Sequence, residues 1–203
     1  MGCNFGRFFG EENWECSIPI SLCNLQSPFF FISLHSSSSG EPTVLKLYPL
    51  AVSPKGVRAG NTERQPFPTM YWLSCPALKA TISHLEKNGL VVEWEKRLQG
   101  NQESLIAMEK AHKEYAEERW SMLTDEDMAI VRRNRWDQAL GLTSGVAGIN
   151  KPATIKCLHT HFAHFLATGE NLVGKWVHDA LVARAEGGAA TGGEGAEGSS
   201  TRP

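Results

Sequence analysis

Apolar residues recur at helical spacing through most of the second half of the chain. Between Pro76 and Asn88 they stand at every third or fourth position, and Pro76 suits the first turn of a helix. Similar spacing continues over 91–98 and 103–123, where charged residues fill the other positions. One row along the longer segment contains Leu105, Met108, His112, Tyr115 and Arg119. The high charge density predicts a solvated amphipathic helix there.

Capping signals mark the remaining helices. Thr124 is followed by three acids, the outline of a capping box, which predicts a helix through about Leu140. After the loop GLTSGVAGIN, Pro152 predicts the start of the next helix and Gly169 its end. Asn171 is suited to cap a last helix.

A single segment, Thr69 to Leu73, has the aromatic and β-prone composition of a strand and lies between prolines. We therefore expect a mainly α protein, with a compact helical domain over residues 61–182 and one or two short strands. Residues 1–60 are predicted to be an N-terminal extension that is poorly ordered or serves in targeting. Residues 183–203 form a Gly/Ala/Glu tail without a large apolar residue to bury, so we expect disorder there.

The composition narrows the classes of function. A formal net charge of -2 over 203 residues provides no overall basic field, so we expect no nucleic-acid partner. No apolar run is long enough for a transmembrane segment. The five cysteines are odd in number and thinly spread, which is typical of thiols in a reducing compartment. A cytoplasmic location is expected, and the Ser-rich, acid-poor stretch 17–39 supports import into a plastid or mitochondrion as the alternative.

One short stretch, KCLHTHFAH at residues 156–164, concentrates candidate metal ligands. On the helix predicted from Pro152, apolar residues occupy one face, while Cys157, His161 and His164 are spaced i, i+4, i+7 and share the other. Thiolate and imidazole groups are the ligands that tetrahedral Zn²⁺ prefers. The other histidines with no such neighbours are interpreted as surface or structural residues: His84, His112 and His178.

Cys75 is the candidate for a fourth partner. It precedes the helix predicted at Pro76, where backbone amides and the helix dipole stabilise a thiolate. Together with Cys157, His161 and His164 it would complete a Cys₂His₂ zinc site. Alternatively, Cys75 is a nucleophile whose proton passes to one of the two histidines, while amides at the helix start hold an oxyanion. Plain core packing of these side chains is the third interpretation.

Basic residues and glycines lie directly upstream of this stretch. Arg132 and Arg133 belong to the helix that begins after Thr124, a glycine-rich loop follows, and Lys151 stands at the next helix start. Guanidinium groups and backbone amides at a helix start suit phosphate or carboxylate, which predicts a site for a small anionic ligand. No Gly-Lys-Ser/Thr follows the glycines, so this is no Walker loop. A surface basic helix and a flexible turn is the simpler interpretation.

Several blocks of the sequence, in order, resemble domain-of-unknown-function family 501 (DUF 501), an uncharacterised family known mainly from bacteria. The blocks are PFPTMYWLSCPAL, ISHLEKNG, SGVAGI, KCLHTHFAHFL and GENLVG, spread over Pro66 to Gly174. The resemblance implies a small soluble intracellular domain and implies no reaction. Two departures stand out: the region before the FPT block lacks the family's Cys-Pro element, which puts a metal in doubt if that cysteine is a ligand, and Leu172 replaces a proline.

Two functions from different classes follow. The first is a non-enzymatic binding or structural module, stabilised by zinc, whose charged helices over 91–140 bind a protein partner. The second is a small hydrolase or transferase that uses Cys75 or a metal-bound water, with His161 and His164 in acid–base or ligand roles. In that case an anionic substrate would be held by Arg132, Arg133 or Lys151. No complete catalytic set is visible, which favours the first.

Overall fold

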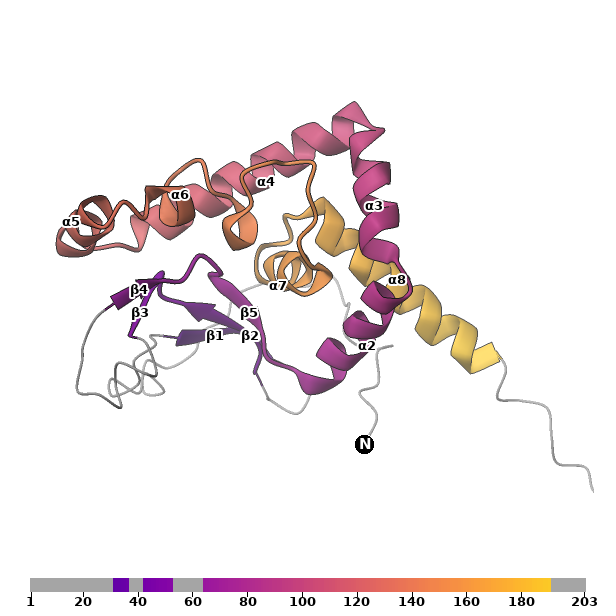
Figure 1. Ribbon diagram of the computed structural model, residues 1–203. Coiled ribbons are helices and arrows are strands. Elements are labelled where there is room, and N and C mark those ends of the chain that lie inside the picture. Colours follow the sequence, from indigo (N-terminus) through magenta and orange to yellow (C-terminus); the bar gives the residue numbers. More distant parts are fainter. Residues whose placement is uncertain (1–30, 37–41, 53–63, 191–203) are drawn as a thin grey trace, which may run out of the picture.

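The structure is a computed structural model that describes residues 31–36, 42–52 and 64–190, and helices surround a small sheet in it (Figure 1). Three strands form one antiparallel sheet in the order β1-β2-β5, and β3 pairs with β4. The strands are β1 (Phe31–Ser36), β2 (Pro42–Leu47), β3 (Leu50–Val52), β4 (Arg64–Pro66) and β5 (Tyr71–Leu73).

Most of the described chain is helical, which confirms the mainly α class. The helices are α2 (Pro76–Lys87), α3 (Leu90–Gln99), α4 (Gln102–Ser121), α5 (Asp125–Arg133), α6 (Asp137–Leu140), the 3₁₀ turn η3 (Val146–Gly148), α7 (Leu158–Thr168) and α8 (Leu172–Ala190). The extended segment expected at 69–73 is β5, but the described strands are more numerous than the one or two expected.

The additional strands come mainly from the segment expected to be an N-terminal extension. Val44 of β2 lies opposite Leu73 of β5, and the Leu47 N–H donates to the Met70 carbonyl at 2.7 Å. Residues 42–52 therefore belong to the same packed unit as the helices. Of residues 1–60, predicted to be poorly ordered or to serve in targeting, residues 1–30, 37–41 and 53–60 lie outside the described part of the chain.

Helix α7 lies at the centre of the arrangement, between α4, the sheet and α8 (Figure 1). It packs most extensively against α8 and β5. Gly174 makes the close approach to α8 possible, because a Cβ at this position would collide with the His161 carbonyl and with Phe165. A helix enclosed on several sides must bury polar as well as apolar residues, and α7 does so.

Helix α4 differs from its expected character. The row predicted to belong to a solvated amphipathic helix is its buried side, since Met108, Tyr115 and Arg119 are fully buried and His112 is 6% exposed. Exposed charged residues lie on the outer side, where ion pairs such as Lys113 with Glu117 form. The physical reason is that α4 packs against α7 and against the glycine-rich loop, so its inner row becomes core.

Three predicted helix ends are confirmed. The Thr124 hydroxyl accepts a hydrogen bond from the Asp127 N–H at 3.2 Å, and the Asn171 side chain accepts one from the Gly174 N–H at 2.8 Å. Gly169 ends α7 with a φ of 74°, a conformation that glycine adopts without strain.

Two other helix boundaries were predicted wrongly. The helix expected to continue to Leu140 breaks after Arg133, where Arg135 has a φ of 58°, and the break allows α5 and α6 to bury Val131 and Leu140 in a small second core. The helix expected from Pro152 begins only at Leu158. Helix α8 continues to Ala190, past the predicted start of the tail at residue 183, and residues 191–203 lie outside the described part.

Candidate functional site

Cys157 lies just outside helix α7, which changes the predicted ligand face. It is the N-cap residue, with an extended backbone, so it does not share a helical face with His161 and His164. Those two histidines are 0% and 3% exposed and belong to the core. The stretch 156–164 is thus divided into an accessible end at Cys157 and His159 and a buried part at His161 and His164.

The accessible end forms a compact group with α2. The ligand atoms of Glu86, Cys157 and His159 all lie within 4.8 Å of one another, and each residue is partly exposed. His159 Nδ1 lies 3.0 Å from Glu86 Oε1, which also accepts the Leu158 N–H at 2.7 Å. The Cys157 thiol lies 3.1 Å from the Thr160 hydroxyl. Glu86 therefore caps α7 from α2 and holds His159 in place.

The hydrogen bonds of His159 indicate a charged ring. Nδ1 faces the Glu86 carboxylate and Nε2 lies 3.1 Å from the Lys79 carbonyl, and since both neighbours are acceptors, both nitrogens carry protons. The contact with Cys157 contributes most to raising the pKa of His159 to about 9, against the opposing effect of burial. Burial alone would raise the pKa of Cys157, but hydrogen bonds with His159 and Thr160 lower it overall.

This group differs from the predicted set of Cys75, Cys157, His161 and His164. Within residues 31–36, 42–52 and 64–190, the Glu86 group is the one set of three such side chains that comes close enough to share an ion. Cys75 is the N-cap of α2, as expected, and is a free, partly exposed thiol that makes no side-chain capping hydrogen bond. The sequence analysis did not identify Glu86 as a candidate ligand. The one indication in the sequence was its position at the end of the helix predicted from Pro76.

A second cluster surrounds the inner side of α7. Asn171 bridges its two histidines: His161 Nδ1 lies 3.3 Å from Asn171 Oδ1, and Asn171 Nδ2 lies 3.0 Å from His164 Nδ1. Because Oδ1 also accepts the Gly174 N–H, the amide orientation is fixed. His161 therefore donates from Nδ1 and carries a bare Nε2, whereas His164 accepts at Nδ1 and carries its proton on Nε2.

His112 of α4 completes this cluster and was wrongly interpreted as an isolated residue. Its ring lies edge-on to that of His161, with 6.2 Å between centroids. Burial is the main cause that lowers the pKa of all three rings, to about 4 for His112 and about 3 for His161 and His164. They are neutral at physiological pH. The signal in the sequence was the position of His112 in the apolar row of α4.

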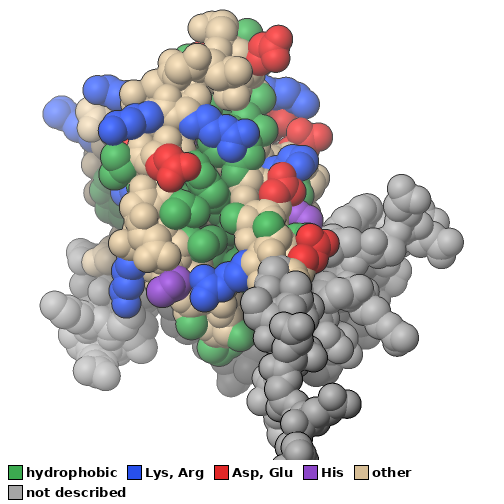
Figure 2. Space-filling view, turned by 90° about the vertical axis from the view of Figure 1, so that its right-hand side faces the viewer, with side chains coloured by type: hydrophobic (Ala, Val, Ile, Leu, Met, Phe, Trp, Pro, Cys, Tyr) green, Lys and Arg blue, Asp and Glu red, His purple; other side chains and the backbone are tan. Residues whose placement is uncertain are grey.

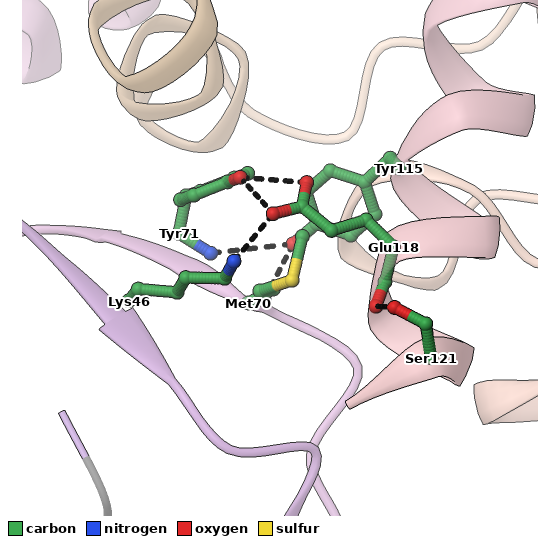
Figure 3. A network of polar contacts seen from close by, with 6 residues as sticks. All are labelled: Lys46, Met70, Tyr71, Tyr115, Glu118 and Ser121. Carbon is green, nitrogen blue, oxygen red and sulfur yellow. Dashed lines mark hydrogen bonds and ion pairs between the residues drawn. The ribbon is translucent and has the colours of Figure 1, made fainter. Parts of the chain in front are cut away.

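Glu118 connects α4 to the sheet beside this cluster (Figure 3). Its carboxylate accepts hydrogen bonds from the Tyr71 hydroxyl at 2.7 and 2.8 Å and pairs with Lys46 of β2. Burial, reinforced by Glu118, raises the pKa of Tyr71 far above its usual value, so the hydroxyl remains a donor. Tyr71 also stacks on His164 with 5.5 Å between centroids, so the network forms one wall of the histidine cluster.

The predicted anion-binding residues are spread over two places. Arg132 and Arg133 lie exposed in the last turn of α5, and the Arg132 guanidinium lies over the Trp120 ring at 6.0 Å. Lys151 lines a shallow surface pocket together with Lys156 and Thr154. The lining of that pocket includes neither arginine, so an anion site that uses all three predicted residues has no support from the described geometry.

The architecture is that of a mainly α domain with a Cys/His/Glu group at the start of its central helix and a buried histidine cluster between that helix and its neighbours. The chain belongs to the family described as protein of unknown function (DUF501), which matches residues 34–179. The match begins before Pro66 and includes strands β2 and β3, which agrees with their packing against the rest of the domain. No curated protein and no solved structure matches the chain. Among the described helices, none has the length and apolar character needed to cross a membrane.

Proposed function

We propose that this protein is a binding module that holds one divalent ion of the zinc class at Glu86, Cys157 and His159, and so joins α2 to the start of α7. The observation that supports this proposal is the mutual distance of the three ligand atoms, all within 4.8 Å. A carboxylate, a thiolate and an imidazole are accepted ligands of zinc.

The surroundings of His159 favour this assignment. Nδ1 faces Glu86 and would bind the ion, while Nε2 faces the Lys79 carbonyl. A ligating histidine commonly donates its other N–H to a carbonyl or carboxylate, which fixes the ring. Binding of the ion would release the Nδ1 proton of His159. The lowered pKa of Cys157 makes its deprotonation to the thiolate easier.

Three protein ligands leave one position of a tetrahedral ion for a water or for a ligand from a partner. The protein partner expected from the sequence remains a proposal, and the outer surface offers room for it. Figure 2 shows apolar side chains gathered between charged ones on the face viewed from the right of Figure 1, where α2, α3 and α8 lie in front. Such mixed faces are typical of protein contacts.

The test is a zinc titration of the purified protein against a chromophoric chelator. We expect one zinc per chain, and a loss of affinity of at least about tenfold in both Cys157→Ser and Glu86→Gln. Cys75→Ser is the matched control, because it removes a thiol at a helix start outside the group. Wild-type affinity in Cys157→Ser would refute the proposal. Loss of zinc in Cys75→Ser would instead favour the site predicted with Cys75, Cys157, His161 and His164.

A second candidate, a nucleophilic thiol, is favoured by one observation: Cys157 combines a helix N-terminus, the charged His159 and a lowered pKa. This role replaces the predicted enzyme chemistry of Cys75 with His161 and His164, since those two rings are buried. Metal-free protein should then react with iodoacetamide at Cys157 faster than at Cys75, and His159→Gln should slow the reaction. Equal rates at the two cysteines would exclude this candidate.

A further inference from the structure

Both cysteines in the described part of the chain occupy the same kind of position. Cys75 is the N-cap of α2 and Cys157 is the N-cap of α7, and each is a partly exposed free thiol on an extended backbone. At such a position the amides and the dipole of the helix favour a negative charge on the sulfur. A difference in reactivity between the two thiols must therefore come mainly from the side chains around them.

Two neighbouring side chains favour a negative charge on the sulfur of Cys157. Its Sγ lies 3.1 Å from the Thr160 hydroxyl, in the first turn of α7. A ring nitrogen of His159 lies within 4.8 Å of Sγ, and this ring is charged because both of its nitrogens face acceptors. The hydroxyl and the imidazolium therefore stabilise a thiolate at Cys157.

Glu86 is the one acid of this group, and its charge opposes a thiolate nearby. Its Oε1, however, accepts the Leu158 N–H at 2.7 Å and lies 3.0 Å from His159 Nδ1, so the imidazolium offsets the carboxylate charge. Cys75 makes no side-chain capping hydrogen bond and does not belong to the Glu86 group. The surrounding side chains thus favour the thiolate at Cys157 over the thiolate at Cys75.

We propose that Cys157 is a site of oxidation by hydrogen peroxide, which converts its thiolate to a sulfenic acid. The sulfur attacks one peroxide oxygen, an S–O bond forms and the O–O bond breaks, so that the sulfur is oxidised and the peroxide is reduced. The hydroxide that leaves takes a proton from the His159 imidazolium and becomes water. A partly exposed thiolate beside a cation is the kind of cysteine that peroxide oxidises selectively.

This modification would also regulate the metal site, a consequence that rests on the proposed function. Cys157 is the one sulfur ligand of the proposed ion, and the thiolate is the form of cysteine that binds a metal. Oxidation removes this ligand, so the ion should leave Glu86 and His159. A small thiol would restore the site, because it converts the sulfenic acid to a mixed disulfide and then back to the free thiol.

The first experiment treats the reduced, metal-free full chain with hydrogen peroxide in the presence of dimedone, which traps sulfenic acids. Peptide mass spectrometry then measures the label at each cysteine, and we expect Cys157 to be labelled at least about tenfold faster than Cys75. His159→Gln and Thr160→Val should each lower this ratio, the second by about fivefold, the effect of one hydrogen bond. Thr81→Val is the matched control, because that hydroxyl bonds to the Ala77 carbonyl of its own helix.

Two outcomes of this experiment would overturn the oxidation site. One is equal labelling of Cys157 and Cys75, and the other is a labelling ratio that stays unchanged in both His159→Gln and Thr160→Val. Because the two cysteines are compared within one molecule, a partly unfolded variant would show itself by faster labelling of Cys75 as well.

A second experiment tests the metal separately, by adding peroxide to the zinc-loaded protein together with a chromophoric chelator. We expect zinc release from the wild type and from Cys75→Ser, and renewed zinc binding after reduction with dithiothreitol. Retention of zinc by protein whose Cys157 is oxidised would exclude this regulation. Failure of the reduced protein to bind zinc at all would instead count against the proposed function, while the labelling at Cys157 decides the oxidation site.

Discussion

Helix α7 holds histidines in two regions whose surroundings differ: one region is accessible and the other is buried. At its start, His159 is partly exposed, faces two acceptors and is charged. Two and five positions further, His161 and His164 are buried, share a single amide and are neutral. Two histidines only two positions apart thus differ by about 6 in pKa, because the contact with Cys157 favours the charged form of His159, whereas burial disfavours the charged form of His161. Their neighbours decide what these histidines do.

The largest expected effect that tests this contrast is a loss of stability in acid. In the unfolded chain the histidines take up protons near pH 6.5, while His112, His161 and His164 in the folded state stay neutral down to about pH 4 or 3. The unfolded state therefore binds more protons, and stability falls as pH decreases below 6.5. At pH 5 the loss is about 2 kcal/mol for each such histidine.

Urea unfolding at pH 7, 6 and 5 measures this loss. His159→Gln is the matched control, because it removes a histidine of the same helix whose pKa is raised rather than lowered in the folded state, so the loss of stability in acid should persist in this variant. Equal unfolding free energies at pH 7 and 5 would show that the inner histidines are not held neutral.

The second effect, of intermediate size, is expected from the amide that organises the inner cluster. Asn171→Ala would leave His161 Nδ1, His164 Nδ1 and the Gly174 N–H without their partner. Loss of a cap and of hydrogen bonds to buried groups should lower the free energy of unfolding by about 3 kcal/mol. Thermal or urea unfolding measures it, with the exposed neighbour Glu170→Ala as control. A change as small as that of the control would contradict the assigned hydrogen bonds.

The smallest expected effect is a loss of stability at alkaline pH, caused by the charged His159 at the start of α7. His159 has a pKa that is raised in the folded state, so its contribution is complete below pH 6.5 and is lost as pH rises toward about 9. In metal-free protein this contribution is about 1 kcal/mol, allowing for partial exposure. Cys157→Ser should remove most of this pH dependence between 6.5 and 9, because the contact with Cys157 contributes most to the raised pKa, whereas Cys75→Ser should preserve it. An unchanged alkaline slope in Cys157→Ser would show that Cys157 does not set the pKa of His159.

The sequence predicted the helices well where local signals decide their ends. Thr124, Gly169 and Asn171 act through residues three or four positions away, so their roles can be inferred from spacing alone. The start of α7 could not be inferred in this way. Leu158 receives its cap from Glu86, 72 positions earlier, and no local pattern records such a contact.

The candidate site shows a second limit of sequence reasoning. The apolar spacing of Leu158, Phe162 and Leu166 correctly identifies one buried side of α7, but assigning the remaining histidines to an accessible face assumes that the helix has one. Because α7 is enclosed by α4, β5 and α8, its polar residues are buried too and need partners from elsewhere. His112 and Asn171 are those partners, and both come from other elements of the fold.

The central place of α7 also has a consequence for synthesis on the ribosome. The sheet, α2 and α4 are made before residues 158–168, the helix against which they pack. Until then the inner row of α4, with Met108 and Tyr115, lacks the part of its cover that α7 provides, and β5 lacks its main helix. A nascent chain that pauses before Leu158 thus exposes the future core, the kind of surface that chaperones recognise. The nascent chain should no longer depend on chaperones once α7 has emerged from the ribosome and covers this surface.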